Sequence, residues 1–410
     1  MNKSRRIALS AAIFVCYASL AEDAASRARF DGDAIVRVYV SDDAQLASLL
    51  DMTDDVWSHG VGLGPVDVRL SVASQVAIEL LGWDYDVLIP DLQSLIDDRG
   101  GQSDATAGVS SVFDNFQPLS VVDAHLLALE NLRPDLAERV QIGTSLRGRP
   151  MYVVRISGPG DTADRPDIFI HGGIHAREWI TVTTVLYLAD RLVHDYDSDS
   201  YVRRLVNQAN WYIMPVYNPD GYDYSWTNNR LWRKNRRSSF GVDLNRNYDA
   251  NWGGVGSSGS PNDQTYRGAA PFSEPETQAV RDFVLGLPNF AGYFDVHSYS
   301  QLLMWPWGPT PALPEDNLEF EILGQEMVRL IQDVHGRTYA PGPIYTTIYP
   351  VSGGSIDWVY QDTGVLAMTF ELRDTGEAGF LLPPNQILPN AEEAFPALLH
   401  YADHVSAPIR

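Results

Sequence analysis

The sequence predicts an α/β protein in which a small open α/β sandwich precedes a larger domain with a central, mixed and largely buried β-sheet flanked by helices. Length is the first observation: 410 residues are too many for one small domain, because domains usually run about 100–200 residues. The apolar fraction of 45% is ordinary for a globular protein. Strand-like and helix-like runs alternate over about the last 290 residues, as they do in sheets covered by helices.

The first 21 residues have the pattern of a secretory signal. Three basic residues precede an apolar run over residues 7–21, in which Ser19 and Ala21 are small enough for a signal peptidase. That run has fifteen residues, whereas a membrane span needs about 20. We therefore expect a signal peptide over residues 1–21 and a secreted chain without membrane attachment, periplasmic if the host is bacterial. The alternative is a membrane anchor that is never removed.

Composition excludes several classes of protein. The single cysteine, Cys16, lies within the signal segment, so a scaffold held by internal disulfides is excluded. The formal charge is −23, from 53 acidic and 30 basic residues, which argues against a surface for nucleic acid or anionic membranes. The acidity is densest in residues 22–114, where eighteen acidic residues stand against five arginines.

Residues 31–105 form the predicted small domain. Two of its segments alternate between apolar and polar residues, as half-buried strands do, and each is followed by a helix-like run. A further short strand completes an open-faced α/β sandwich. The expected strands are 34–40, 66–72 and 84–89, and the expected helices are 44–51 and 73–81.

A linker-like segment follows over residues 99–112. It is rich in Gly, Ser, Ala and Thr, which is the composition of a flexible and exposed chain. Beyond it we expect one larger domain over residues 113–404. Its expected strands are 151–156, 168–171, 211–216, 292–297 and 365–372, and its expected helices are 124–132, 180–194, 274–287 and 318–335.

The strongest local signal lies at residues 171–179, His-Gly-Gly-Ile-His-Ala-Arg-Glu-Trp. His175 and Glu178 are three apart after an apolar strand, and one imidazole with one carboxylate suits a divalent metal, zinc above all. A catalytic zinc needs a third protein ligand, and His297 closes another apolar strand. Because ligands gather at the carboxyl ends of strands in open α/β sheets, we expect these residues to meet. His171 is expected to be a buried strand-end residue rather than a fourth ligand.

Seven motifs, in order along the chain, resemble those of one protein family. They are Gly173-Ile-His-Ala-Arg-Glu-Trp-Ile, Asn218-Pro-Asp-Gly, Asn229-Arg-Leu-Trp-Arg-Lys, Gly241-Val-Asp-Leu-Asn-Arg-Asn, His297-Ser-Tyr-Ser-Gln, Gly353-Gly-Ser-Ile-Asp-Trp and Thr369-Phe-Glu-Leu-Arg-Asp-Thr-Gly. With them, the chain resembles the zinc metallocarboxypeptidases of the pancreatic carboxypeptidase A type, the funnelins, from about residue 113 to 403.

The resemblance also implies a domain organisation. Residues 31–105 look like the inhibitory pro-domain of that family, and residues 106–112 would be the activation linker. The chain would then be made as a zymogen, cut by an activating protease at the exposed linker. Its substrates would be the C-termini of peptides and proteins, and we expect it to act as a monomer.

The resemblance implies roles for the residues around the metal. His175, Glu178 and His297 would hold one Zn²⁺ per chain, since two histidines and a glutamate are the ligand set of carboxypeptidase A itself. Asp243 would accept the other ring N–H of a zinc histidine. Glu371 would act as general base and then as acid, and its place on an apolar strand agrees with a functional carboxylate.

Other residues would bind the substrate. Arg233 would stabilise the developing oxyanion, because a fixed cation acts where negative charge appears. A planar guanidinium matches a carboxylate bidentately, which would restrict the enzyme to chain ends. The residues implied for the C-terminal carboxylate are Asn245, Arg246 and Tyr349, and those implied for neighbouring subsites are Arg177, Tyr299 and Phe380.

Ile356 matches the floor of the specificity pocket in that family. An aspartate there would select C-terminal Lys or Arg, whereas isoleucine gives an apolar floor on which a buried cation would be uncompensated. Ile344, Ile348 and Met304 would add apolar walls. The expected activity is therefore zinc-dependent hydrolysis of the C-terminal peptide bond, with release of aromatic or large aliphatic residues.

Alternative interpretations stay open at this point. The chain could be a non-catalytic peptide-binding relative, although such relatives normally lack the base or a metal ligand. It could also be a related zinc amidase or deacylase for small substrates, against which the three-residue carboxylate site argues. Residues 230–237 carry five cations, which is a possible nucleic-acid patch, but in so acidic a chain we favour recognition of a carboxylate and an oxyanion.

Overall fold

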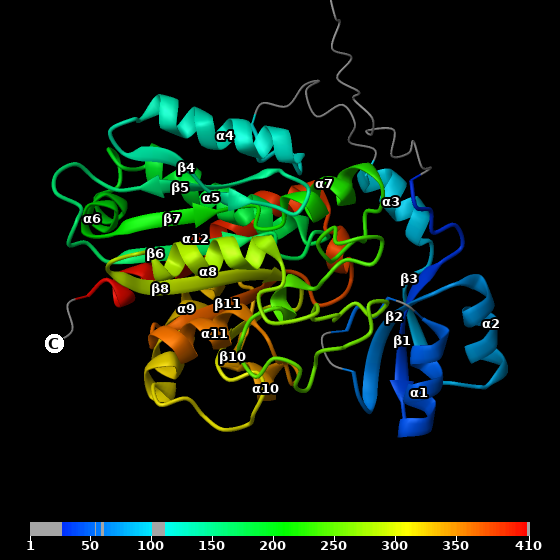
Figure 1. Ribbon diagram of the computed structural model, residues 1–410. Coiled ribbons are helices and arrows are strands. Elements are labelled where there is room, and N and C mark those ends of the chain that lie inside the picture. Colours follow the sequence, from blue (N-terminus) through cyan, green and yellow to red (C-terminus); the bar gives the residue numbers. More distant parts are fainter. Residues whose placement is uncertain (1–26, 54, 59–60, 101–110, 408–410) are drawn as a thin grey trace, which may run out of the picture.

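The computed structural model describes residues 27–53, 55–58, 61–100 and 111–407. Figure 1 shows two domains, a small one that ends with α3 (Leu92–Gly100) and a larger one that includes α4 (Leu119–Leu132) and all later elements. The predicted signal segment and most of the predicted activation linker lie outside the described residues. Within the described part of the chain, no helix is long and apolar enough to cross a membrane.

A three-stranded antiparallel sheet of order β2-β1-β3 forms the frame of the small domain. Val36 and Val38 of the central strand pack with Leu49 and Ile78 of two helices on one face. Ile35 faces the other side and packs with residues of the large domain. This is the open sandwich that the sequence predicts. Its elements are β1 (Ala34–Val40), α1 (Asp43–Met52), β2 (Gly64–Leu70), α2 (Val72–Leu80), β3 (Tyr85–Ile89) and α3.

Helix starts in the small domain follow from capping residues. The Asp42 side chain accepts a hydrogen bond from the backbone N–H of Gln45, and Ser71 does the same for Ser74, so each first turn has a satisfied donor. The sequence does not predict α3, because its end merges with the linker composition. Leu92 of α3 is buried against the large domain, and tertiary packing of this kind stabilises a short helix.

An eight-stranded mixed sheet of order β10-β9-β11-β8-β6-β7-β5-β4 forms the centre of the large domain. Strands β11, β8, β6 and β7 are parallel, whereas β9, β5 and β4 join antiparallel neighbours. The middle strands are buried along their length, as expected of a sheet covered on both faces. The strands are β4 (Ala137–Thr144), β5 (Pro150–Ile156), β6 (Asp167–Gly172), β7 (Asn210–Met214), β8 (Phe290–Ser298), β9 (Leu302–Trp305), β10 (Ala340–Pro343) and β11 (Ala367–Leu372).

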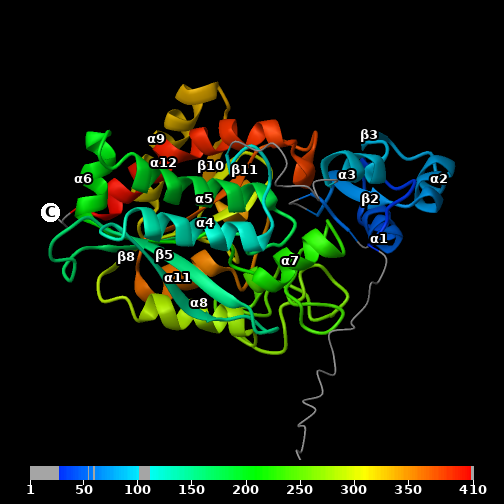
Figure 2. The same ribbon diagram turned by 90° about the horizontal axis from the view of Figure 1, so that it is seen from above.

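Helices cover both faces of this sheet, as Figure 2 shows: α4, α5, α9 and α12 lie on one face, and α8 and α11 on the other. Besides α4, the helices are α5 (Trp179–His194), α6 (Ser200–Gln208), α7 (Pro219–Thr227), α8 (Pro275–Leu285), α9 (Asn317–His335), α10 (Ile344–Thr347), α11 (Ser355–Thr363) and α12 (Ile387–Val405). Three short 3₁₀ turns are η1 (Leu244–Arg246), η2 (Gly379–Leu381) and η3 (Pro384–Gln386).

All strands and helices predicted for the large domain are present, with shifted ends. The sequence does not predict β4, β9, β10, α6, α7, α10, α11 or α12. Strands β9 and β10 have four residues each, which is too short for a clear alternation. Helix α12 contains Pro396, a residue that normally argues against a helix interior.

The strand order brings the predicted site residues to one edge of the sheet. Strands β6, β8 and β11 are neighbours and parallel, so their carboxyl ends open on the same side. Glu371 of β11 lies opposite His297 of β8 in the strand register, and the loop after β6 carries His175 and Glu178. Segments far apart in the sequence therefore meet at this edge.

Candidate metal centre

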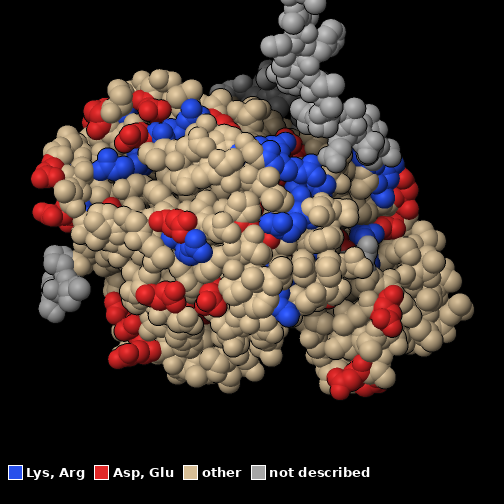
Figure 3. Space-filling model, viewed as in Figure 1, with Lys and Arg blue, Asp and Glu red and all other residues tan. Residues whose placement is uncertain are grey.

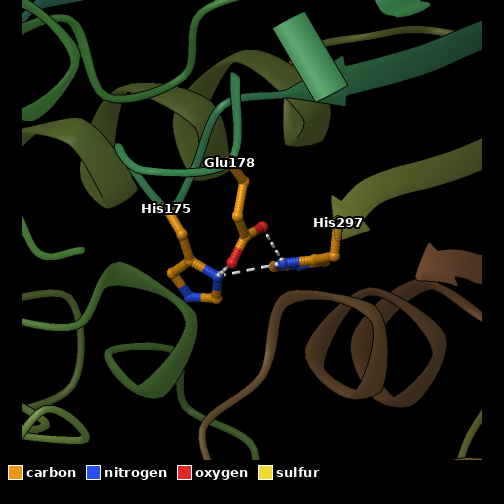
Figure 4. A group of neighbouring side chains, drawn as sticks. All are labelled: His175, Glu178 and His297. Carbon is orange, nitrogen blue, oxygen red and sulfur yellow. Dashed lines mark hydrogen bonds and ion pairs between the residues drawn. The ribbon is translucent and has the colours of Figure 1, made fainter. Parts of the chain in front are cut away.

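His175, Glu178 and His297 point toward one another from the β6–α5 loop and the end of β8 (Figure 4). His175 Nδ1 lies 2.9 Å from Glu178 Oε1 and 3.0 Å from His297 Nδ1, and Glu178 Oε2 lies 3.2 Å from His297 Nδ1. The three side chains are buried, and their ligand atoms lie within 4.8 Å of one another. Two imidazoles and one carboxylate with an open side suit a catalytic zinc, so these residues fit that metal.

A tight turn places the first two ligands. Gly173 has a φ of +67°, and a Cβ at this position would lie 3.0 Å from the carbonyl oxygen of Pro215, so only glycine fits without strain. The Thr181 hydroxyl accepts a hydrogen bond from the Gly173 N–H and donates one to the Glu178 carbonyl. The turn is thus tied to the first residues of α5, which fixes the spacing of His175 and Glu178.

Asp243 lies where the resemblance implies, on the far side of the His175 ring. Its Oδ1 is 3.1 Å from His175 Nε2, and its Oδ2 accepts a hydrogen bond from Arg233 at 2.9 Å. Burial alone would raise the pKa of Asp243, but Arg233 and His175 hold it well below the usual range. Arg233 also lies 3.8 Å from Glu178 Oε1, so it reaches the metal centre from the side.

A second carboxylate, Asp295, lies beside His297 and is not among the residues predicted from the sequence. Its Oδ2 is 2.9 Å from His297 Nε2 and accepts a hydrogen bond from Ser355 Oγ at 2.7 Å. Asp295 stands two residues before His297 on a strand, so both side chains project from the same face. An aspartate at that spacing within an otherwise apolar strand is the signal that points to it.

Glu371 is the last residue but one of strand β11 and is buried. Burial raises its pKa well above the usual glutamate value, against the opposing effect of His297. It lines the same cavity as His175 and His297. A carboxyl group whose pKa is raised in this way is suited to take up and release a proton during a reaction.

Asn245, Arg246 and Tyr349 meet at this cavity, as the resemblance implies. Arg246 Nη2 donates to the Tyr349 hydroxyl at 3.0 Å, and Arg246 Nε donates to the Gly256 carbonyl at 2.8 Å. Arg246 is 2% exposed, and among the described residues no carboxylate forms an ion pair with it. A buried guanidinium with neutral partners favours an incoming anion.

The lining of the cavity also includes apolar side chains. Ile356, at the start of α11, lines it together with the predicted wall residues Met304, Ile344 and Ile348. Asp357 also lines the cavity, although the sequence gives no indication of this. Its carboxyl accepts a hydrogen bond from the Gly308 N–H at 3.1 Å, and burial raises its pKa to about 7.

Arg177, Tyr299 and Phe380 lie elsewhere, against the small domain. Arg177 Nη1 donates to Asp55 Oδ1 at 2.7 Å, and its guanidinium carbon lies 4.0 Å from the centre of the Phe380 ring. The Tyr299 hydroxyl donates to the Trp57 carbonyl at 3.1 Å. The predicted subsite residues are therefore covered by the small domain.

Trp57 is the centre of the contact between the domains. Its ring lies 5.1 Å from the Phe380 ring, and its Nε1–H donates to Asp55 Oδ2 at 3.2 Å. Around it, apolar residues of both domains form one buried cluster, which includes Phe30, Ile35, Leu92, Leu231 and Leu381. None of the small-domain residues that the structure describes lines the cavity at the metal centre.

The five cations of residues 230–237 are held inside the large domain. Burial lowers the pKa of Lys234 to about 8, so it stays mostly protonated at neutral pH but loses its proton more easily than an exposed lysine. The partners are the Arg177 and Phe380 carbonyls for Arg230, Asp243 for Arg233, the Pro261 and Asp263 carbonyls for Lys234, the Tyr224 ring for Arg236 and Glu274 for Arg237.

Because each of the five cations has a partner within the large domain, residues 230–237 do not form a free basic patch for nucleic acid. On the face shown in Figure 3, acidic side chains are spread over both domains, and basic ones lie both at the upper left of the large domain and on its part nearest the small one.

Known proteins resemble this chain over both domains. A family model described as zinc carboxypeptidase matches residues 122–397. Mouse carboxypeptidase A2 is 39% identical over 397 residues, which cover 92% of this chain and 94% of that protein. Bovine carboxypeptidase B is 35% identical over 395 residues, with the same coverage of 92% and 94%.

Solved structures give the same result. The crystal structure of thrombin activatable fibrinolysis inhibitor matches with a TM-score of 0.86 and 29% identity, over 93% of this chain and all of that one. Carboxypeptidase A from Helicoverpa armigera matches with a TM-score of 0.81 and 30% identity, over 92% of this chain and 98% of that one. Relatives named A and B match at similar identity, so similarity alone does not choose between their specificities.

Proposed function

This chain belongs to the zinc carboxypeptidase family, and we propose that it is an A-type enzyme that releases aromatic or large aliphatic residues. As a zinc-dependent metallocarboxypeptidase it hydrolyses peptides at their C-termini. One observation carries the finer proposal: Arg246 is buried with no ion-paired carboxylate among the described residues, at a cavity whose lining includes Ile356. A substrate that ends in a free carboxylate and an apolar side chain would satisfy both groups.

The chemistry is divided between the metal and the chain. Zinc held by the three ligands would polarise a carbonyl oxygen and make water nucleophilic near neutral pH. Glu371 would accept the proton of the attacking water and deliver it to the departing amine. Arg233, fixed by Asp243 at 2.9 Å, would support the negative charge that develops on the carbonyl oxygen.

Substrate binding is assigned to the other end of the cavity. Arg246 would pair with the terminal carboxylate, with Asn245 and Tyr349 as further hydrogen-bond partners. Ile356 would contact the terminal side chain, and a Lys or Arg side chain would meet no carboxylate at that position. Asp295 and Asp357 also line the cavity, but the Ser355 hydroxyl already donates to the first and the Gly308 N–H to the second. This supports A-type rather than B-type specificity.

Four matched peptides test this proposal. They share one sequence, end in Phe or Lys, and carry either a free carboxylate or an amide at the C-terminus. We expect fast release of Phe from the free peptide, slow release of Lys, and no release from either amide. Treatment with a chelator should abolish the activity, and added zinc should restore it. Equal cleavage of free and amidated peptides would contradict exopeptidase activity, and faster release of Lys would contradict the A-type assignment.

The small domain, predicted over residues 31–105, is proposed to be an inhibitory pro-domain of the catalytic domain, residues 113–404. The support is that Asp55 occupies Arg177 and that Trp57 packs on Phe380, both proposed substrate-subsite residues. An activating protease would cut within the activation linker, residues 106–112. Proteolysis between α3 and α4 should therefore raise the peptidase activity.

Export is proposed from the first segment, residues 1–21. Its basic start and apolar run are those of a signal peptide, and the mature chain is proposed to be a secreted monomer. N-terminal sequencing of protein recovered from the medium or periplasm should give a chain that starts after residue 21. A retained Met1 would contradict this, and light scattering of the same sample should give the mass of one chain.

A further inference from the structure

Asp295 is a fully buried charged side chain beside the metal ligands that has no role in the chemistry above. We propose that Asp295 is a positioning residue for the metal ligand His297, and that Ser355 and His171 hold Asp295 in place. The inference rests on the proposed ligand set and is independent of the substrate that the enzyme accepts. Asp295 belongs to strand β8, and its neighbours come from β6 and α11.

The first argument concerns the far nitrogen of the His297 ring. His297 turns Nδ1 toward the other two ligands, so a bound metal leaves the ring proton on Nε2. That Nε2–H needs an acceptor because the side chain is only 4% exposed. Asp295 Oδ2 lies 2.9 Å away.

Asn245 is the rival partner for the same nitrogen. Its Nδ2 lies 3.0 Å from His297 Nε2. The amide is oriented by the backbone N–H of Ser355, which donates to Asn245 Oδ1 at 2.8 Å. An amide nitrogen cannot accept a hydrogen bond, so in the metal-binding tautomer Asp295 provides the acceptor.

The second argument is a comparison with the other histidine ligand. His175 has its own buried carboxylate, with Nε2 3.1 Å from Asp243 Oδ1. Each imidazole of the site therefore has one nitrogen toward the metal position and a carboxylate near the other. Such partners fix the ring orientation and make the imidazole a stronger ligand.

The third argument concerns what surrounds Asp295. Ser355 Oγ donates to Oδ2 at 2.7 Å, and His171 lies directly opposite Asp295 in the β6–β8 register. His171 Nε2 is 2.7 Å from the Tyr293 hydroxyl, which can donate to it and leave the ring proton on Nδ1. That Nδ1 is 3.4 Å from Asp295 Oδ1, and neither atom has another hydrogen-bond partner among the described residues.

His171 is therefore a neutral support rather than a fourth metal ligand. Burial lowers its pKa to about 4, so the ring stays uncharged at neutral pH. Its Nδ1 lies 3.4 Å from Asp295 Oδ1, and His171 is not among the three residues whose ligand atoms come together. The Asp295 carboxylate thus has neighbouring donors on both oxygens, which is what a buried charge requires.

The test is the zinc affinity of Asp295→Asn in the full-length chain, measured by competition with a zinc chelator at neutral pH. The substitution keeps the shape and removes the charge. We expect about 10- to 100-fold weaker zinc binding, the usual effect of losing such a partner. The thermal midpoint of the metal-free chain is measured in parallel, and it should fall no further than in the control variant below.

Asp167→Asn is the matched control. Asp167 is 1% exposed at the opposite end of neighbouring strand β6, where it accepts hydrogen bonds from Asn210 and from the Asn289 backbone. Its zinc affinity should equal that of the unmodified chain. Equal weakening in both variants would overturn the proposal, because it would indicate a general effect of losing a buried carboxylate.

Two further variants separate the partners of His297. Asn245→Ala should leave zinc affinity unchanged, and a loss there with none in Asp295→Asn would make Asn245 the partner and overturn the proposal. Ser355→Ala removes one donor to Asp295 and should weaken zinc binding several-fold. If Asp295→Asn does not fold, this variant decides, since unchanged affinity in Ser355→Ala would contradict the proposed support.

Discussion

Two buried arginines on the substrate side of the molecule have different partners. Arg177 is 3% exposed and donates to Asp55 of the small domain at 2.7 Å. Arg246 is 2% exposed, and its partners are the carbonyls of Gly256 and Asn245 and the hydroxyl of Tyr349. A buried guanidinium without a carboxylate is costly. The chain thus supplies the counter-charge of Arg177 through Asp55. The counter-charge of Arg246 would come from a bound ligand.

The difference in partners indicates different roles for the two arginine side chains. At Arg246 no carboxylate of the described chain forms an ion pair, and the C-terminus of the proposed peptide substrate would bring that group with it. At Arg177 the carboxylate of Asp55 is already present, with Trp57 packed beside it. The small domain therefore covers the proposed substrate subsite, whereas none of its described residues lines the cavity at the metal centre.

The largest effect should come from a change that affects neither arginine. Replacement Glu371→Gln removes the proposed base, and positioned acid–base groups contribute about 10²–10⁴-fold. We expect the turnover rate of the cleaved enzyme to fall by that factor while zinc content stays constant.

The pH dependence of kcat/KM of the unmodified enzyme is a second test of Glu371 as the base. The carboxylate must be ionised to accept a proton, and burial raises its pKa above the usual value of 4.5. The acid limb of kcat/KM should therefore lie above that value. Full activity in the Glu371→Gln variant, or an acid limb at the usual value, would contradict the assigned role.

Arg246→Gln directly tests the role of the buried arginine that has no carboxylate partner among the described residues. Losing one partner of a buried charge pair costs about 2–5 kcal/mol, so kcat/KM for peptides with free C-termini should fall by about 30- to 5,000-fold. The preference for free over amidated C-termini should shrink with it. Arg177→Gln is the matched control, and on dipeptide substrates it should have a much smaller effect. Equal losses in the two variants would remove the distinction between the arginines.

Ile356→Asp tests the other end of the same cavity. A carboxylate on the floor would attract a cationic side chain and would make burial of an apolar one unfavourable. We expect release of Phe to slow and release of Lys or Arg to accelerate, with a change in their ratio of at least about tenfold. Rates on the four matched peptides measure it. An unchanged ratio would mean that Ile356 does not contact the terminal side chain.

Asp55→Ala should give the smallest effect of the four substitutions. Hydrogen bonds to charged groups are worth about 1.5–3 kcal/mol, so the uncleaved chain should gain about tenfold in activity as the small domain opens more often. Asp31→Ala is the control, because Asp31 pairs with Arg29 on the exposed surface of the same domain. A gain of equal size in both variants would indicate general loosening of the small domain.

Much of the molecule could be predicted from its sequence because the signals are local. The alternation of residues 34–40 reflects a strand with one face on a core, and β1 has these bounds in the structure. His175, Glu178 and His297 stand at the ends of apolar strands, and the parallel order β6, β8 and β11 brings such ends together. To predict that these three residues meet, it was enough to assume that the strands before them are neighbours in the sheet.

The remainder depends on long-range contacts that no local pattern encodes. The pair Asp55–Arg177 joins positions 122 residues apart, and Asp55 is one of many acidic residues in its domain. Asp295 could be noticed as an aspartate in an apolar strand, but its partner His171 appears only through the β6–β8 register. Helix α3 likewise forms because Leu92 packs against the large domain, rather than from the sequence of the helix itself.

The small domain is expected to block the path of the substrate without disturbing the metal centre, and one measurement tests this most directly. The rate of Phe release from a peptide is compared for the full-length chain and for the same chain cleaved between α3 and α4, with zinc content measured in both. We predict equal zinc per chain and an increase in activity of at least about tenfold on cleavage. Equal activity before and after cleavage, or zinc bound only after cleavage, would contradict it.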